Sequence, residues 1–436
     1  MKQNYKPKWY NLTHKTTLNV DKRSAITKIK VLPNPLLDLT GNFIMKTNRL
    51  LSENNEPSFS ETTININTKF DAGSIEVIDA NQPGNIILKI RKDTNSHFAH
   101  WFYFQTNNVK DKEAVFNFID MDKTAYPEGW VDYKVCASYD NSTWFRVQTS
   151  FDGKMLSCSF IPTSNTVYLA YFEPYSYDSH LKLISQANNQ SDIINHEILG
   201  QTSLGRNIDL LLVGNPESKN KIWVIARQHP GETMAEWFME GFISSFLDRQ
   251  DALARTMLQD CVFYLVPNMN PDGAYLGNLR VNSVGTNLNR EWVSPSLDKS
   301  PEVYYVRNKM IEVGVDMFFD IHGDEALPYV FTSGCEENPS WSVKQQKLND
   351  KFIKYLKITN PDYQTKYGYE RGHFSAETAT LATSWVGDRF DCLALTVEMP
   401  FKDNKNLPDE SCGWSGKRSS MLGKSFLTTI SLVLHG

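Results

Sequence analysis

The chain has 436 residues, of which 41% are hydrophobic and 22% are charged, and its formal net charge is −5. These values are typical of a globular protein with two or three domains. The small acidic excess argues against nucleic acid or an anionic membrane as the main partner.

The sequence offers no membrane span and no secretion signal. Its apolar runs fall short of the roughly 18 residues that cross a bilayer, and its N-terminus lacks the apolar core of a signal peptide. We therefore expect a cytoplasmic protein whose cysteines are reduced thiols. The six cysteines form no Cys-x-x-Cys pair; they are Cys136, Cys158, Cys261, Cys335, Cys392 and Cys412.

Residues 1–61 form the predicted N-terminal extension. The first thirty residues are rich in lysine, and Asp21 is the only acid among them. No amphipathic period runs through this stretch. We expect a solvated arm that packs on the body of the protein, with a targeting or partner-binding tail as the alternative.

Residues 62–190 predict an antiparallel β-sandwich. Short runs of aromatic and β-branched residues alternate here with turn clusters such as 82–85 and 139–142. His97 and His100 are expected to cap and face a strand rather than to bind a metal. The aromatic side chains suit the core of a sandwich, and binding of a sugar or peptide is an alternative use. The predicted strands include 86–91, 101–104, 114–119, 144–147 and 167–172.

Residues 191–436 predict an α/β domain. Strands and helices alternate, which indicates a mixed, mainly parallel sheet with helices on both faces and a site at the carboxyl ends of the strands. The stretch 176–205 is interpreted as the crossing between the two domains. Strands are expected at 208–213, 222–226, 262–267, 315–321, 329–332 and 392–399. Helices are expected at 234–247, 252–258, 301–313, 341–356 and 418–434.

Three residues have the pattern of a catalytic zinc site. His229 and Glu232 follow the buried strand 222–226, and His322 follows the buried strand 315–321. Two imidazoles and one carboxylate leave a fourth zinc position open for water. A histidine and a glutamate three residues apart also occur by chance as a turn cap beside a helix start. The third residue at a second strand end is what favours a metal.

Further candidate residues follow other predicted strands. Glu398 lies near the end of an apolar strand, where a carboxylate suits a general base, although it could also face water. Arg280 and Arg290 are expected on loops near the same sheet edge. Loop arginines are usually solvated, but a guanidinium with an asparagine amide such as that of Asn289 is well suited to bind a carboxylate.

Taken together, these motifs resemble the zinc metallocarboxypeptidases. The order and approximate spacing match for His229-Pro-Gly-Glu232, Asn270-Pro-Asp-Gly273, Asn289-Arg290, His322 and Thr396-Val-Glu398. The earlier runs Phe70-Asp-Ala-Gly-Ser, His100-Trp-Phe-Tyr-Phe and Pro174-Tyr-Ser-Tyr resemble the cytosolic carboxypeptidase branch, whose members carry a β-sandwich ahead of the catalytic domain. The resemblance covers about residues 64–434.

The resemblance implies a role for each residue. One Zn²⁺ per chain would be held by His229, Glu232 and His322, with Glu398 as the general base. Arg280 would stabilise the oxyanion, and Asn289 with Arg290 would hold the terminal carboxylate of a peptide or protein substrate. The branch also suggests a preference for acidic C-terminal residues, for which the candidate cations are Arg371, His373 and Arg389.

Two positions depart from the family pattern. Asn287 stands where secreted relatives have an aspartate that supports a zinc histidine; its amide oxygen can accept the same hydrogen bond without a charge. The tyrosine that closes over the substrate in those relatives has no clear counterpart, and Tyr367 and Tyr369 are the candidates. Alternative functions are an N-acyl-amino-acid deacylase on the same scaffold and a non-catalytic peptide- or carbohydrate-binding protein that works through the sandwich.

Overall fold

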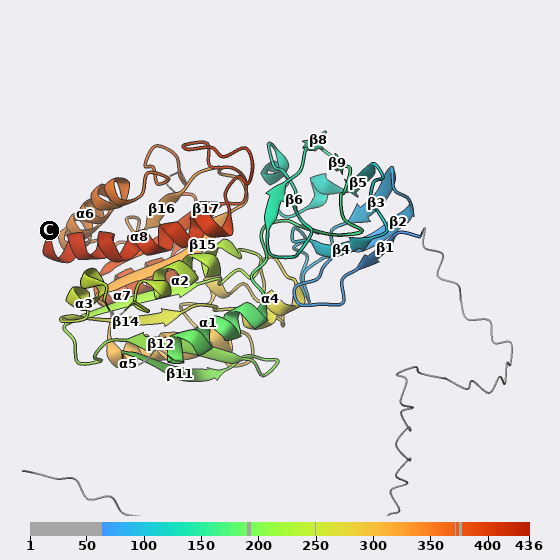
Figure 1. The fold of residues 1–436 in the computed structure, drawn as a ribbon. Coiled ribbons are helices and arrows are strands. Elements are labelled where there is room, and N and C mark those ends of the chain that lie inside the picture. The colour runs from blue at the N-terminus through green and yellow to red at the C-terminus, as the bar shows by residue number, and fades with distance from the viewer. Residues whose placement is uncertain (1–62, 190–192, 249, 371, 375–376) are drawn as a thin grey trace, which may run out of the picture. The chain divides into compact units, whose positions relative to one another are not determined.

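The computed structural model describes residues 63–436, apart from residues 190–192, 249, 371 and 375–376. The predicted N-terminal extension lies outside the described residues. The described residues from 63 on belong to one compact unit, which contains both the sandwich and the α/β part. Figure 1 shows the sandwich in blue to cyan and the α/β part in green to red.

The described part of the sandwich consists of two five-stranded sheets. Its strands are built by in-out alternation: in β5, Ala114, Phe116 and Phe118 are buried while the residues between them are partly exposed. The predicted sandwich is confirmed. One strand pair differs from the prediction, because β3 and β5 run parallel, with Ile86 opposite Phe116.

The order of strands in the first sheet is β1 (Asn65–Asn67), β4 (Tyr103–Asn107), β10 (Thr166–Ala170), β6 (Cys136–Ser138) and β7 (Trp144–Arg146). The order in the second sheet is β2 (Glu76–Gln82), β3 (Asn85–Lys89), β5 (Ala114–Ile119), β9 (Leu156–Phe160) and β8 (Thr149–Phe151). Two short 3₁₀ helices, η1 (Met121–Lys123) and η2 (Pro127–Trp130), follow β5.

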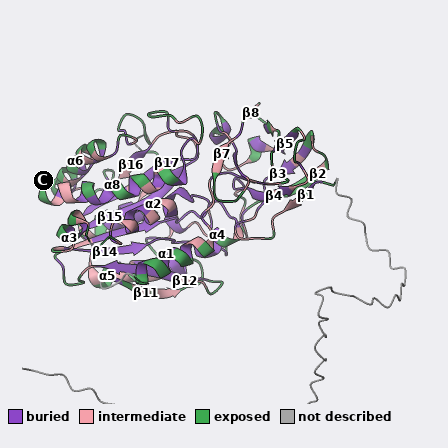
Figure 2. Ribbon diagram, viewed as in Figure 1, coloured by how far each residue is buried: buried purple, intermediate pink, exposed green. Residues whose placement is uncertain are grey.

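A seven-stranded mixed sheet forms the centre of the described α/β part. Its middle strands are parallel, and β11, β12 and β16 pair antiparallel at its two sides. The strand order is β11 (Ile194–Gln201), β12 (Asn207–Val213), β14 (Cys261–Val266), β13 (Asn220–Ala226), β15 (Met317–Asp324), β17 (Leu393–Pro400) and β16 (Phe331–Gly334). The central strands β14 and β15 are buried along their whole length (Figure 2).

Helices cover both faces of this sheet, as predicted. Strand β13 shows why: Ile222 and Val224 belong to one apolar core, whereas Trp223 and Ile225 belong to the other. The first core also takes up α1 (Tyr177–Asn189), α2 (Met234–Ser244), α3 (Ala252–Met257), α6 (Val343–Thr359) and α8 (Gly416–His435). The second core takes up α5 (Pro301–Val313) and α7 (Ala382–Phe390). Helices α2 and α8 run side by side (Figure 1).

In the α/β part, some elements were not predicted. These are α1, β11, α7 and the short α4 (Pro271–Leu276), together with the 3₁₀ turns η3 (Leu288–Arg290) and η4 (Thr378–Thr380). Strand β11 is an edge strand with mostly half-exposed residues, so it lacks the apolar run that marks the central strands. Helix α1 packs on β11 and β12, within the stretch interpreted as the crossing between domains. The domain limits 62–190 and 191–436 stay a prediction.

The sandwich and the α/β part are joined by specific contacts. Arg146 of β7 donates hydrogen bonds to the carbonyl oxygens of Phe401 (2.8 Å), Cys412 (3.2 Å) and Trp414 (3.1 Å). The ring of Tyr171 stacks on that of Phe401, with 4.4 Å between the centroids. The two parts therefore share buried polar and aromatic contacts.

Two further observations concern the predicted cysteine state and membrane topology. All six cysteines are described by the structure and are free thiols, and all but Cys412 are buried. Within the described residues, no helix combines the length and the hydrophobicity that a bilayer crossing requires.

Candidate metal centre and active site

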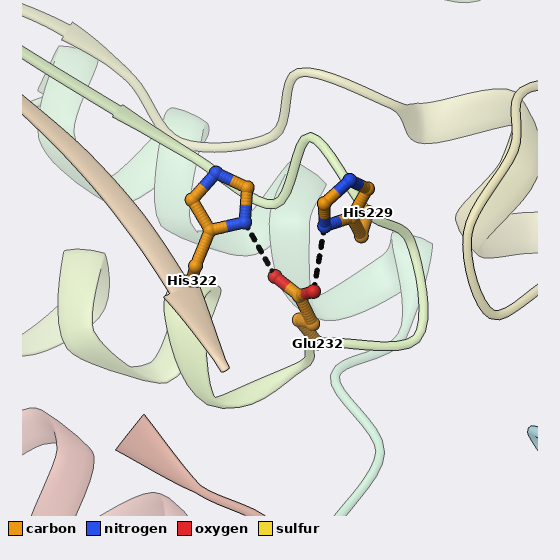
Figure 3. A group of neighbouring side chains, drawn as sticks. All are labelled: His229, Glu232 and His322. Atoms are coloured by element: carbon orange, nitrogen blue, oxygen red, sulfur yellow. Dashed lines mark hydrogen bonds and ion pairs between the residues drawn. The ribbon is translucent and has the colours of Figure 1, made fainter. Parts of the chain in front are cut away.

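His229, Glu232 and His322 meet at the ends of two neighbouring strands. His229 and Glu232 lie in the loop between β13 and α2, and His322 lies on β15, which pairs in parallel with β13. The Nδ1 atom of His229 lies 2.6 Å from Oε1 of Glu232, and Nδ1 of His322 lies 2.7 Å from Oε2 (Figure 3). The three residues can offer ligand atoms that all lie within 4.8 Å of one another.

The donor set fits a zinc ion. All three side chains are buried, with 5% of His229 and 2% each of Glu232 and His322 exposed. Burial lowers the pKa of His229 to about 3, which keeps its imidazole neutral, as a metal ligand must be. Although burial opposes it, the carboxylates of Asp320 and Glu232 raise the pKa of His322 well above its usual value, so a metal ion bound at its Nδ1 would have to displace a proton. Two nitrogens and one carboxylate oxygen are a common catalytic zinc donor set.

The other ring nitrogens are held by hydrogen bonds that orient the Nδ1 atoms. Nε2 of His322 lies 2.9 Å from Oδ2 of Asp320, a carboxylate. Nε2 of His229 lies 3.1 Å from Oδ1 of Asn287, so the amide oxygen does accept the hydrogen bond considered from the sequence. The two candidate ligands thus differ in the charge of the group behind them, which tunes ligand basicity.

The loop that carries His229 and Glu232 is tightly held. Gly231 donates its N–H to the carbonyl oxygen of Leu279 at 2.8 Å, and a Cβ atom at position 231 would lie only 2.9 Å from Cα of Leu279. The buried Arg227 donates to the carbonyl oxygen of Pro230 at 2.8 Å and to Oε2 of Glu236 at 2.6 Å. The position of the short Pro-Gly turn is therefore fixed by contacts with α2 and with the loop that follows α4.

A cavity of about 440 Å³ opens over this centre. The seven residues predicted from the sequence all line it: His229, Glu232, Arg280, Asn289, Arg290, His322 and Glu398. Glu398 lies directly opposite His322 in the pairing of β17 with β15. The register of two parallel strands therefore places a second carboxylate beside the candidate metal ligands.

Glu398 is a buried carboxylate with one of its two oxygens anchored. It is 5% exposed, and burial raises its pKa to about 8. Its Oε1 accepts a hydrogen bond from the Tyr369 hydroxyl at 3.0 Å, whereas Oε2 has no partner among the described residues. One carboxylate oxygen is thus anchored, and the other is left without a partner among the described residues.

The two tyrosine candidates have different positions. Tyr369 lines the cavity, and its hydroxyl lies 2.8 Å from Oδ2 of Asp324 as well as close to Glu398. Its ring stacks on His373, which also lines the cavity. Tyr367 is 43% exposed and stacks on Tyr329 instead. Nothing in the local sequence separates the two; the fold of the loop after α6 does.

Arg280, predicted to stabilise the oxyanion, and the two predicted substrate-binding residues, Asn289 and Arg290, come from the stretch between α4 and α5. The guanidinium of Arg280 lies 5.6 Å from the ring of Phe98 and 5.5 Å from that of Tyr126, and it donates no hydrogen bond to any described residue. Arg290 donates Nη1 to the carbonyl oxygen of Asn289 at 2.8 Å and forms an ion pair with Glu377. The Asn289 amide oxygen accepts a hydrogen bond from Ala382 N–H at 2.9 Å.

Comparison with known proteins assigns the chain to a family. Residues 181–412 match the family model described as zinc carboxypeptidase, and residues 66–172 match that of the cytosolic carboxypeptidase N-terminal domain. The chain belongs to the zinc carboxypeptidase family. It is therefore a metallopeptidase that uses one zinc ion and acts on the C-termini of peptides or proteins.

Solved carboxypeptidases share the fold. The metallo-carboxypeptidase of Burkholderia cenocepacia is 45% identical, with a TM-score of 0.82 over 85% of this chain and 99% of that chain. That of Pseudomonas aeruginosa, solved in complex with (2-guanidinoethylmercapto)succinic acid, is 42% identical, with a TM-score of 0.82 over 85% of this chain and 99% of its own. Cytosolic carboxypeptidase 6 of Caenorhabditis elegans is 28% identical over 76% of this chain and 77% of its own length.

Other residues of this carboxypeptidase line the cavity and were missed by sequence reasoning. Tyr126 and Glu128 both come from the sandwich: Tyr126 directly precedes η2, and Glu128 lies within it. No motif marks them, because their place depends on how the two parts pack. Among the proposed cations for an acidic residue, His373 lines the cavity, whereas Arg389 is exposed near the end of α7 and does not. Arg371 lies outside the described residues.

Proposed function

We propose that this zinc carboxypeptidase removes the C-terminal residue of peptides by zinc-assisted attack of water, with Glu398 as the general base. The observation that carries the proposal is the single cavity lined by His229, Glu232, His322 and Glu398 together with Arg280 and Arg290. Zinc ligands, a base and two guanidinium groups are the parts that such a hydrolysis needs.

The metal and the base have separate tasks. A zinc ion held by His229, Glu232 and His322 would lower the pKa of a water molecule to about 7 and polarise the scissile carbonyl. Glu398 accepts a proton from the attacking water through Oε2, the oxygen without a partner among the described residues, and then donates it to the leaving amine. The Tyr369 hydroxyl holds Oε1 during this exchange, and we propose Tyr369 as the tyrosine that closes over the substrate.

The cationic side chains bind charge on the substrate. Arg280 has no hydrogen-bond acceptor among the described residues, so its guanidinium is available to the oxyanion that forms as water attacks. Arg290 and Asn289 bind the terminal carboxylate. Because Arg290 is ion-paired with Glu377, the substrate carboxylate has to take the place of that glutamate.

We further propose a preference for acidic C-terminal residues and a cytoplasmic location. His373, one of the candidates for contact with an acidic side chain, lines the cavity, where its imidazole can form a hydrogen bond to a substrate carboxylate. The similarity to cytosolic carboxypeptidases supports the proposed location.

A scan of the C-terminal residue tests the proposal. The zinc-loaded protein is incubated with peptides that differ only in the last residue, and release of the free amino acid is measured. Peptides ending in glutamate or aspartate should be cleaved fastest, and the same peptides ending in a C-terminal amide should resist cleavage because Arg290 has no carboxylate to bind. A dipeptide and an N-acyl-glutamate in the same assay test the deacylase alternative. A zinc-loaded protein that is inert toward every peptide would refute the proposal.

A further inference from the structure

The sandwich holds the loop that carries Arg280. Both carboxylate oxygens of Asp93, which follows β3, accept hydrogen bonds from the backbone of this loop. Oδ1 accepts from the N–H of Leu279 at 2.7 Å, and Oδ2 accepts from the N–H groups of Arg280 at 2.7 Å and Val281 at 3.3 Å. Asp93 is 4% exposed. A buried carboxylate with three backbone donors from another part of the protein is a strong and specific anchor.

The residues next to Asp93 extend the anchor, and we call residues 91–95 the clamp loop. The N–H and the hydroxyl of Thr94 donate to Oδ1 of Asn278 at 3.0 and 3.1 Å. Arg91 donates to the carbonyl oxygen of Leu276 at 2.5 Å, and Asn95 donates to that of Ser283 at 3.1 Å. The clamp loop thus binds the segment 276–283 along its whole length.

The segment 276–283 also contacts the loop that carries the candidate metal ligands. The carbonyl oxygen of Leu279 accepts the hydrogen bond from Gly231, which lies between His229 and Glu232. Arg280 has aromatic neighbours from the sandwich, but its guanidinium has no hydrogen-bond acceptor among the described residues. The place of this guanidinium in the cavity therefore depends on the backbone that Asp93 holds.

We propose that Asp93 is a positioning residue for catalysis: it fixes the backbone of residues 279–281 so that Arg280 faces the oxyanion. This inference rests on the proposed role of Arg280. Electrostatic stabilisation depends on donors placed within about half an ångström, and a shift of about 1 Å can cost up to 100-fold in rate. Asp93 does not line the cavity, so on this account it contributes to the chemistry from outside.

A double-mutant cycle tests the proposal on the full chain. The values of kcat and KM are measured for the wild type, Asp93→Asn, Arg280→Ala and the double variant, with zinc content and thermal stability measured for each. Asp93→Asn keeps the size of the side chain but removes its charge and one acceptor. We expect it to lower kcat about tenfold with KM within about twofold, and to lower kcat less than about twofold when Arg280 is already alanine.

The control is Asp120→Asn, another sandwich aspartate, which is ion-paired with Lys89 and Lys123 on the surface. It should leave kcat unchanged. If Asp93→Asn lowers kcat by the same factor with and without Arg280, Asp93 acts only on stability and the proposal is wrong. If Arg280→Ala itself leaves kcat unchanged, the proposed role of Arg280 fails instead.

A second variant covers the case in which Asp93→Asn does not fold. Thr94→Val removes one side-chain hydrogen bond of the clamp loop and keeps the backbone one. It should lower kcat about threefold with Arg280 present and leave it unchanged in the Arg280→Ala protein. An equal effect in both proteins, or no effect in either, overturns the proposal.

Discussion

On the metal side of the cavity, His229 and His322 lie at the ends of paired strands, and each has its second ring nitrogen held by a polar side chain. On the substrate side, Arg280 and Arg290 extend from loops and take their partners from distant segments. Arg280 is flanked by aromatic rings of the sandwich. Arg290 is paired with Glu377, whose side chain is 55% exposed. The metal side is fixed by the sheet, whereas the substrate side depends on loops that are held by other segments of the chain. Chemistry and specificity should therefore respond differently to mutation.

Removal of the metal should have the largest effect. Treatment with a chelator is expected to reduce peptide cleavage to background, and added zinc should restore it. The same treatment should lower the melting temperature, because an ion that binds only the folded protein stabilises it. Activity and thermal unfolding are measured before and after dialysis. Full cleavage by a protein that metal analysis shows to be free of zinc would contradict the assignment of the centre.

Replacement of the general base should come next. Glu398→Gln keeps the hydrogen bond to Tyr369 but cannot accept a proton, so we expect kcat to fall by about 10²- to 10⁴-fold with KM little changed. Zinc content should stay at the wild-type level, since Glu398 is not one of the proposed ligands. Steady-state kinetics and metal analysis of the same preparation test both expectations. A variant that loses its zinc together with its activity would show that Glu398 supports the metal instead.

Zinc affinity should change in opposite directions when the charge of the side chain behind each histidine is altered. Asp320→Asn removes the carboxylate behind His322 and should weaken zinc binding by about 10- to 100-fold. Asn287→Asp places a carboxylate behind His229 and should strengthen zinc binding by up to about tenfold. Competition titration against a chromogenic chelator measures both. Equal zinc affinity in all three proteins would mean that these partners only orient the rings.

The smallest expected change is at the substrate side. Glu377→Gln removes the carboxylate that is paired with Arg290, so a substrate carboxylate no longer has to displace it. We expect KM to fall about two- to fivefold with kcat unchanged, since an exposed ion pair contributes little free energy. Glu336→Gln, at a glutamate that does not line the cavity, is the matched control. A raised KM would show that Glu377 helps to orient Arg290 for the substrate.

The metal side was predictable because it follows from strand patterns. His229, His322 and Glu398 each come at the end of an apolar run, and parallel strands bring their carboxyl ends to one edge of a sheet. The sequence therefore indicates that these residues meet, and the pairing of His322 with Glu398 shows how closely. The central strands and the long helices were predictable for the same reason.

The substrate side was only partly predictable. Arg280 and Arg290 could be named from motifs, but the contacts of Tyr126 and Asp93 depend on how the sandwich packs against the loop after α4. The choice between Tyr367 and Tyr369 depends on one turn of a loop. These outcomes come from tertiary packing between segments far apart in the chain, for which single-sequence patterns carry no signal.

The guanidinium of Arg146 couples the unfolding of the sandwich to that of the α/β part. It donates to the carbonyl oxygens of Phe401, Cys412 and Trp414, and the nearby Tyr171 covers the ring of Phe401. Removal of the sandwich by truncation after β10 would leave those carbonyl oxygens without their donor and would expose the ring of Phe401 to solvent. An exposed aromatic surface of this kind favours aggregation. Calorimetry of the intact protein should accordingly record one melting event shared by both halves.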